Sequence, residues 1–317
     1  MELKNIFRKS ALVLALGLPV FLTSCKKDED PGNTITDVVV NNGSFSILEA
    51  AVIKANLQTT LSGTGPFTVF APNDAAFTAS GITTTTLNSL TPAQVSSILL
   101  YHTIPARILA ADVPAGPNAK VVTASGDSVF VTKNSTGVFI NGIQVTSADV
   151  AADNGVIHVV GRVLNPPAGN IVETAVASGL DSLVKAVTRA TTAAGGDPTL
   201  AGTLGSAKLT VFAPTNAAFT QLLSALSLTD INQIPIGTLL AVLRYHVVGT
   251  RAFSSDLANG NLTMLAGGNA TINLTNGTGG GPTILGNGNS GNRSNITATN
   301  IVCRNGVVHL IDRVLLP

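Results

Sequence analysis

Residues 67–77 read FTVFAPNDAAF, and residues 209–219 repeat this stretch as LTVFAPTNAAF, 142 positions later. The Thr-Val-Phe run inside it is typical of a short buried strand, and the Ala-Pro pair that follows ends any ladder because proline has no N–H to donate. Asn73, or Thr215 in the second copy, can then cap a helix. The stretch therefore predicts a strand, a proline break and a capped helix, and it predicts them twice.

Helices are predicted on both sides of this stretch. Before it, residues 34–52 and 170–187 carry an apolar helical period, and we expect a glycine, Gly43 or Gly179, to close a first helix in each. After it, Pro92 starts a further helix at a position where its missing N–H costs nothing. This helix runs into a Tyr-His pair, and its counterpart in the second copy does the same.

The composition changes to β beyond these helices. Short β-forming runs between Gly and Asn turns predict strands at residues 120–122, 128–132 and 138–140. Each copy then closes on a shared block, NGVIHVVGRVL from Asn154 and NGVVHLIDRVLLP from Asn305. An Asn-Gly turn before alternating apolar residues predicts a hairpin and a final strand.

The duplication predicts two tandem domains. A Pro-Pro pair at residues 166–167 marks the boundary, so the first domain spans residues 34–167 (repeat 1) and the second spans residues 168–317 (repeat 2). The copies differ chiefly in the Gly- and Asn-rich residues 259–300, because the closing blocks are offset by 151 positions and the Tyr-His pairs by 144. We expect longer, mobile hairpin loops there.

The N-terminus is a processing segment rather than part of the fold. Residues 1–24 combine a basic start with a short apolar region and end in Leu-Thr-Ser before Cys25. This ending resembles the lipobox of bacterial lipoproteins. The resemblance implies that residues 1–24 are a signal peptide and that Cys25 is lipidated, with palmitate as an acyl group. We therefore expect the membrane to be a partner through Cys25.

Residues 25–33 form a charged tether, since the run Lys-Lys-Asp-Glu-Asp cannot fold alone. The run also resembles the acidic export signal that some Gram-negative bacteria place after the lipidated cysteine. It predicts a lipoprotein anchored in the outer membrane and exposed at the cell surface, with the periplasmic face as the alternative.

The composition supports two well-packed domains and excludes one class of partner. The chain is 45% hydrophobic and only 11% charged, so each copy can bury a core rich in Val, Leu, Ile and Ala. The formal net charge is +1, and no basic stripe with interleaved aromatic residues is present. Both features argue against a nucleic-acid partner.

Three blocks recur in order in each copy: TVFAPxxxAF, a YH pair and NGxxHxxxRVLxP. Together they resemble the fasciclin (FAS1) domain, and the resemblance covers residues 34–317. It implies an α+β fold, in which each domain is a wedge of two β-sheets with about seven strands and with helices packed along it. It further implies adhesion to protein or polysaccharide partners at the cell surface or in the extracellular matrix, without enzymatic activity or a cofactor.

Four histidines occur in the chain, and all are matched between the copies: His102 with His246, and His158 with His309. A metal site that paired His102 with His158 would need a further ligand, but no HxxxH, HExxH or Cys/His cluster is present. We therefore predict no metal site, and we expect each histidine to form hydrogen bonds with backbone groups in or near the core.

Both tyrosines of the chain precede a histidine, as Tyr101-His102 and Tyr245-His246. The resemblance makes these four residues candidate adhesion residues, because the YH region has been implicated in integrin binding in animal members. The alternative is a structural role, since His102 falls on the same helical face as Val95. The sequence favours the structural role.

The sequence leaves two functional classes other than adhesion to consider. In the first, the Gly- and Asn-rich loops of repeat 2 bind a glycan or small ligand. The second, an enzyme, lacks a nucleophile elbow, a P-loop or a dinucleotide fingerprint, so we predict no catalytic residues. The polar pairs Asn73-Asp74 and Thr215-Asn216 could be mistaken for acid/base groups, but their place at a helix start favours capping.

Overall fold

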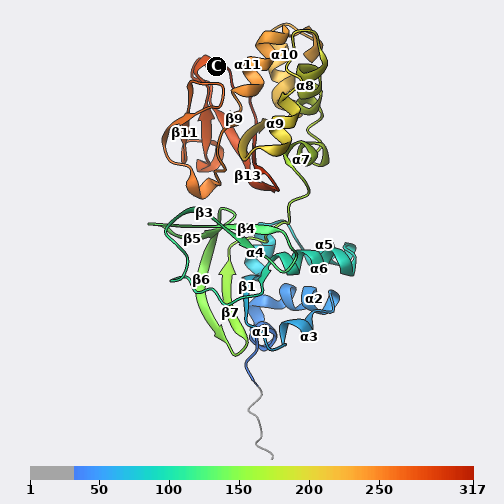
Figure 1. Cartoon of the computed structure of the whole chain (residues 1–317), viewed down its shortest axis with the longest axis vertical. Helices are drawn as coiled ribbons and strands as arrows, with labels where there is room; N and C mark the ends of the chain where they lie inside the picture. The colour runs from blue at the N-terminus through green and yellow to red at the C-terminus, as the bar shows by residue number, and fades with distance from the viewer. Residues whose placement is uncertain (1–31) are drawn as a thin grey trace, which may run out of the picture. The chain divides into compact units, whose positions relative to one another are not determined.

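The computed structural model of the chain describes residues 32–317, and it contains two copies of one α+β arrangement (Figure 1). The prediction of a mixed fold with about seven strands in each repeat is confirmed. Repeat 1 has the strands β1 (Phe67–Pro72), β2 (Thr103–Ile104), β3 (Gly116–Val122), β4 (Ser128–Asn134), β5 (Gly137–Ile140), β6 (Ile143–Ala152) and β7 (Gly155–Val160). Its helices are α1 (Ile35–Val40), η1 (Gly43–Phe45), α2 (Ser46–Lys54), α3 (Gln58–Leu61), α4 (Asp74–Ala79), α5 (Thr84–Ser89) and α6 (Pro92–Tyr101).

Repeat 2 follows the same order of elements. Its helices are α7 (Ile171–Ala177), α8 (Asp181–Thr192), α9 (Leu200–Ser206), α10 (Asn216–Ala225), η2 (Ile231–Gln233), α11 (Ile236–Arg244), η3 (Ser254–Asp256), η4 (Thr278–Gly280) and η5 (Asn287–Asn289). Its strands are β8 (Leu209–Pro214), β9 (Val247–Val248), β10 (Gly260–Thr263), β11 (Asn269–Asn273), β12 (Thr283–Leu285), β13 (Ser294–Cys303) and β14 (Gly306–Ile311). The strand order is β2-β1-β7-β6-β5-β4-β3 in repeat 1 and β10-β11-β12-β13-β14-β8-β9 in repeat 2.

The two sequence blocks that recur most clearly lie side by side as a parallel pair, second and third from one edge of each sheet. β1 pairs with β7 from Phe67 opposite Gly155, and β8 pairs with β14 from Leu209 opposite Gly306. A Cβ on either glycine would clash with the carbonyl oxygen of its partner residue. Glycine is therefore required here by the close approach of two backbones, and not only by the turn before the strand.

The strand of the first shared block, β1 or β8, separates two apolar clusters within its repeat, because successive side chains of a strand point to opposite faces. In β1, Val69 and Ala71 pack with the helices, whereas Phe70 packs among the strands β3 to β6. In Figure 1 the helices α2, α3, α5 and α6 lie to one side of the strands β5, β6 and β7. We call the cluster around Phe70 the strand-side cluster of repeat 1.

The predicted proline break and capped helix after β1 and β8 are confirmed in both copies. Asn73 accepts a hydrogen bond from the N–H of Ala76 at the start of α4, and Thr215 caps α10 in the same way. The next residue, Asp74 or Asn216, accepts from the N–H of the first turn of a neighbouring helix, α2 or α8. These polar side chains therefore satisfy helix N-termini, as the capping interpretation predicted.

One of the two glycine predictions is wrong. Gly179 has a φ of +65° just after α7, and the N–H of Leu180 bonds back to the carbonyl of Ala175, as expected of a glycine that closes a helix. Gly43 instead begins the 3-10 helix η1. In repeat 1 the first helix ends earlier, at Asn41, whose N–H reaches the carbonyls of Asp37 and Val39.

Residues 259–300 hold more regular structure than the predicted long loops. They contain β10 to β12, most of β13 and the short helices η4 and η5. Asn289, which is buried, donates to the carbonyl of Val314 and accepts from the N–H of Leu316, each at 2.9 Å. This part of repeat 2 is therefore bonded to the closing block.

Candidate functional site

The Tyr-His pair of repeat 1 lies at the end of α6, where Tyr101 has no exposed surface. Its hydroxyl donates to the carbonyl of Ser128 at 3.0 Å and accepts from Nδ2 of Asn141 at 2.9 Å. Burial raises the pKa of Tyr101 to about 12. The phenol is therefore neutral and joins the helix to β4 and to the turn after β5.

His102 ends the same helix and is 2% exposed. Its Nε2 accepts from the N–H of Leu164 at 2.9 Å, so Nδ1 carries the proton that it shares with the carbonyl of Ile98 at 2.8 Å. Burial lowers the pKa of His102 to about 4. The ring is therefore neutral at pH 7, and both nitrogens are used by the backbone.

Repeat 2 reproduces this arrangement. Tyr245 donates to the carbonyl of Asn269 at 2.5 Å, and Nε2 of His246 accepts from the N–H of Leu315 at 2.9 Å. Both side chains are at most 2% exposed. A side chain without exposed surface cannot contact a partner directly. The role of the four YH residues in adhesion stays a prediction, and it would have to act through the segments that they hold.

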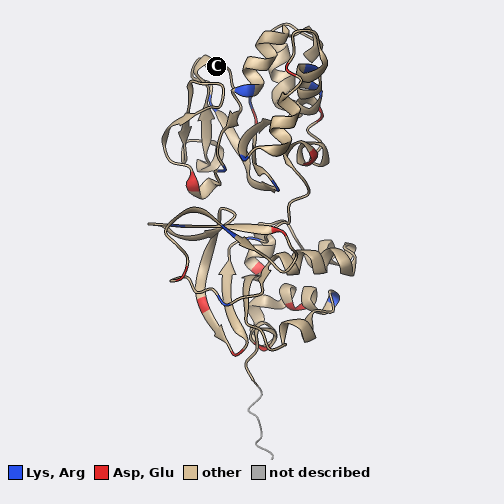
Figure 2. Cartoon of the chain, viewed as in Figure 1, with Lys and Arg blue, Asp and Glu red and all other residues tan. Residues whose placement is uncertain are grey.

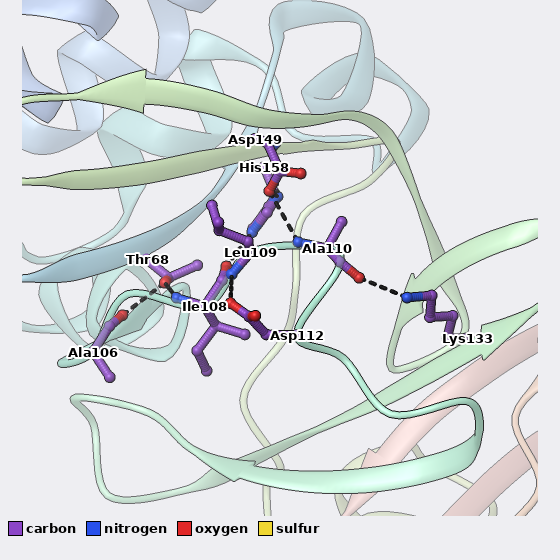
Figure 3. A network of polar contacts seen from close by, with 9 residues as sticks. All are labelled: Thr68, Ala106, Ile108, Leu109, Ala110, Asp112, Lys133, Asp149 and His158. Atoms are coloured by element: carbon purple, nitrogen blue, oxygen red, sulfur yellow. Dashed lines mark hydrogen bonds and ion pairs between the residues drawn. The ribbon is translucent and has the colours of Figure 1, made fainter.

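The second pair of histidines, His158 and His309, holds the segment that follows the YH helix, which is α6 in repeat 1 and α11 in repeat 2. His158 lies on β7, where its Nδ1 accepts from the N–H of Asp149 at 3.2 Å. Its Nε2 therefore donates to the carbonyl of Ile108 at 2.9 Å (Figure 3). In repeat 2, His309 likewise bonds the carbonyl of Ala252 at 3.0 Å. The prediction that all four histidines bond backbone groups near the core is confirmed.

Metal binding would need these nitrogens to be free of such bonds. Within residues 32–317, no group of three or more His, Cys, Asp or Glu side chains lies close enough to hold a metal ion. The sequence-based hypothesis that paired His102 with His158 gains no third ligand from the described part of the chain.

Thr68 and Asn154 are structural residues that sequence reasoning did not single out. Thr68 Oγ1 donates to the carbonyl of Ala106 at 2.6 Å and accepts from the N–H of Ile108 at 2.9 Å. Asn154 Oδ1 accepts from the N–H of Ile35 at 2.9 Å. Thr210 and Asn305 make the equivalent bonds in repeat 2. The available signal was their exact repetition inside the two shared blocks.

The loops of repeat 2 present uncharged polar side chains. Asn276, Asn287 and Asn292 are exposed, and each lies in or beside a short turn of the segment 275–292. The hydrogen bond from the N–H of Thr278 to Asn295 Oδ1, at 2.9 Å, holds one of these turns against β13. The loops are thus both exposed and anchored, which suits a surface that recognises another molecule.

Charged residues are few and scattered over both repeats (Figure 2). Among the described residues, the shortest ion pair joins Lys185 to Asp230 at 2.6 Å, and both side chains are more than 40% exposed. Such exposed pairs contribute little to stability. Any partner of these surfaces would meet mostly uncharged polar and apolar groups.

The two cysteines fall in different parts of the chain. Cys25, the predicted lipidation site, lies outside the described residues, as do the signal peptide and most of the tether. Cys303 ends β13, is fully buried, and has its thiol pKa raised by that burial. In the described part of the chain, no helix is both long and apolar enough to cross a membrane.

Comparison with known proteins agrees with this geometry. The family model for the fasciclin domain matches residues 43–166 and 182–317. Protein sll1483 of Synechocystis sp. is 41% identical over 140 residues, which cover 44% of this chain and 76% of that protein. The uncharacterized protein sll1735 of the same organism is 35% identical over 132 residues, covering 41% of this chain and 96% of that protein.

An animal protein and a solved structure are also similar. The transforming growth factor-beta-induced protein ig-h3 of Sus scrofa is 33% identical over 138 residues, and this chain spans only 20% of its length. A solved FAS1 domain pair from the insect cell adhesion molecule fasciclin I is 19% identical, with a TM-score of 0.37, covering 87% of this chain and 98% of that one. Since the family model matches most of the chain in two segments, the chain belongs to the fasciclin domain family, of which it carries two domains.

Proposed function

We propose that this chain is a surface-anchored lipoprotein that mediates adhesion through its two fasciclin domains. Fasciclin domains are associated with cell adhesion and interaction, and the observation that carries the proposal is the presence of two complete copies in one chain. Two weakly binding domains on one tether raise the effective concentration of the second contact, so the pair binds more tightly than either alone. The partners are proteins or polysaccharides of the cell surface or matrix.

Lipidation at Cys25 is the proposed means of anchoring. It is supported by the lipobox-like ending at residues 22–25 and by the charged run that follows. Replacing Cys25 with Ser removes the acceptor thiol, so the protein should leave the membrane fraction and become soluble in detergent-free extracts. Digestion of intact cells with an added protease then distinguishes the outer surface from the periplasmic face. Retention of the Ser variant in the membrane fraction would contradict the proposal.

The adhesion proposal is tested with beads that carry the tandem or one repeat at equal density. Residues 34–317, 34–167 and 168–317 are compared on immobilised matrix proteins and on polysaccharides, after a melting curve shows that each piece is folded. We expect the tandem to be retained far longer than either repeat. Because the chain has few charges, retention should change little between low and physiological salt. Equal retention of tandem and blank beads on every surface would contradict the proposal.

A second candidate, glycan or small-ligand binding, is supported by the exposed asparagines of segment 275–292. Shortening this segment is a poor test, because β12 lies inside it and pairs with β11 and β13. Replacing Asn287 and Asn292 with Ala leaves the buried Asn289 and its bonds in place. Saturable binding on a glycan array that is lost in this double variant would support the candidate. Binding that survives would place any glycan contact elsewhere.

A further inference from the structure

Repeat 1 contains an apolar cavity of about 260 Å³ on the strand side of its sheet. Its lining is formed mainly by aliphatic side chains from β3 to β6 and from the segment after the YH helix, including Val113, Val121, Val131, Ile140 and Val145. Three of these, Val113, Val121 and Val145, are only partly buried. Part of this apolar surface is therefore left uncovered by the repeat's own side chains.

One wall of the cavity is the segment 105–115, which contains no helix or strand. Its backbone is held from several sides, as Figure 3 shows. Ile108 is bonded by both Thr68 and His158, and Ala110 is bonded by Asp149 through its N–H and by Lys133 through its carbonyl, each at 2.9 Å. The wall is therefore fixed by polar bonds from several elements of the repeat. Collapse of the segment into the cavity would break them.

Repeat 2 carries larger side chains at four of the equivalent lining positions. It carries smaller ones at two others, since Val248 stands in place of Ile104 and Ala252 in place of Ile108. The strand pairings show which residues correspond. Val131 lies opposite Ile140 and Ile272 lies opposite Ile284, so Val131 corresponds to Ile272. Val145 lies opposite Val160 and Ile296 lies opposite Ile311, so Val145 corresponds to Ile296. In the same way, Val121 lies opposite Val129 and Leu262 lies opposite Ala270, so Val121 corresponds to Leu262.

The wall segments match as well. Asp112 accepts from the N–H of Leu109 as Asp256 accepts from that of Phe253, so Val113 corresponds to Leu257. Val113, Val121, Val131 and Val145 are thus each a Leu or Ile in repeat 2, whereas the fifth valine of the lining, Val138, corresponds to Pro282. Leu257, Ile272 and Ile296 are buried there. The fold therefore accepts larger apolar side chains at these four positions.

The chemistry of the cavity selects an uncharged ligand. Its lining is almost entirely hydrocarbon, and burying a charged group among such side chains would be unfavourable. The carboxylate of Asp112 is exposed at the rim, where it would repel an anion and could accept a hydrogen bond from a hydroxyl. A dry apolar cavity of about 150 Å³ is enough to bind benzene. This larger cavity has room for a longer aliphatic molecule.

We propose that the strand-side cavity of repeat 1 is a binding site for an uncharged aliphatic molecule, such as a medium-chain alcohol. The site is independent of the adhesion proposal, since it needs neither the second repeat nor the membrane anchor.

The test uses residues 25–317 with Cys25→Ser, so that no lipid anchor competes for apolar probes. Binding of N-phenyl-1-naphthylamine is followed by fluorescence, and decan-1-ol and decanoate are used as competitors. The filled variant carries Val113→Leu, Val121→Leu, Val131→Ile and Val145→Ile, which copies the residues of repeat 2. The matched control is Val122→Ile, which adds a methylene on the same strand as Val121 but at a position that is 55% exposed.

We expect decan-1-ol to displace the probe from the parent protein and from Val122→Ile. In the filled variant, the affinity for decan-1-ol should fall by about tenfold or more, while the melting temperature stays equal or rises because apolar volume has been filled. If the filled variant does not fold, Val131→Ile alone should still weaken binding. Equal affinity in parent and filled variants, no displacement at all, or displacement by decanoate as strong as by decan-1-ol would each overturn the proposal.

Discussion

The N–H of Leu164 donates to Nε2 of His102 at 2.9 Å, which joins the last residue of the closing block NGVIHVVGRVL to the end of the YH helix. The same bond joins Leu315 to His246 in repeat 2. Because both rings are buried and both nitrogens are bonded to backbone groups, the YH histidine is a structural link between two features that both repeats share: the helix end and the segment that follows the last strand.

Loss of this link should destabilise its own repeat. His102→Ala leaves the N–H of Leu164 and the carbonyl of Ile98 without partners in a buried site, so we expect the free energy of unfolding to fall by about 3 kcal/mol. Guanidinium unfolding measures the change. His246→Ala is the matched variant and should act on repeat 2 alone. A change below about 0.5 kcal/mol in both would contradict the structural role.

Replacing the tyrosines tests adhesion separately from stability. Tyr101→Phe removes the hydroxyl that bonds Ser128 and Asn141, so we expect a loss of about 1–2 kcal/mol in the free energy of unfolding. Bead retention on the identified partner should be unchanged at a temperature where the variant is folded. Tyr245→Phe is the parallel case. Unchanged stability together with lost adhesion would instead assign the phenols to the binding surface.

Stability should fall as the solution becomes mildly acidic. Burial lowers the pKa of His102, His246 and His309 from 6.5 to about 4. Between these two values the unfolded chain binds protons that the folded chain cannot, so the free energy of unfolding decreases as pH falls from about 6.5 towards 4. Each histidine contributes up to about 3 kcal/mol to this decrease. Guanidinium midpoints measured between pH 7 and pH 4.5 provide the check.

A histidine variant supplies the control for that pH dependence. His309→Gln removes one titrating group, so its stability should fall less steeply over the same pH range, whatever its stability at pH 7. A free energy of unfolding that is constant from pH 7 to pH 4.5 in the parent protein would contradict the buried, neutral state of these rings.

The asparagine of each closing block should be as important as the histidine. Asn154 bonds the N–H of Ile35 and the carbonyls of Leu61 and Gly63, at 2.7–2.9 Å, and is 8% exposed. Asn154→Ala should lower the free energy of unfolding by about 3 kcal/mol, since three buried backbone groups lose a partner. Asn41→Ala, at an exposed position, is the control and should have little effect. Similar melting temperatures for the two variants would argue against this role.

The thiol of Cys303 should report the opening of repeat 2. It is fully buried and its pKa is raised, so the thiolate that reacts with disulfide reagents is both scarce and inaccessible. In the Cys25→Ser chain it is the remaining cysteine, and labelling should proceed only as fast as repeat 2 unfolds. His246→Ala should accelerate labelling, whereas His102→Ala should not. Rapid labelling of the parent protein under native conditions would contradict this burial.

Much of the fold was predictable because its signals are local. The capping role of Asn73 follows from a polar residue placed between a strand and a helical run, and the start of α6 follows from Thr91 before Pro92. Gly43 was misread because the first helix of repeat 1 ends at Asn41, and a 3-10 helix then uses the glycine as its first residue. The site was predictable only in part: the sequence favoured a structural role for the YH residues, but the partner of Nε2 in His102 is the N–H of Leu164, far along the chain.

The amino-acid sequence by itself determined the duplication, the strand-proline-helix junctions and the family, because these depend on patterns within a few residues and on their repetition. Only the tertiary structure decided which backbone groups the histidines bond and why Gly155 must be glycine, since both depend on segments far apart in the chain. The cavity of repeat 1 belongs to this second class. Val113, Val121, Val131 and Val145 look ordinary in the sequence, and their consequence appears only where three strands and the segment 105–115 bring them around one space.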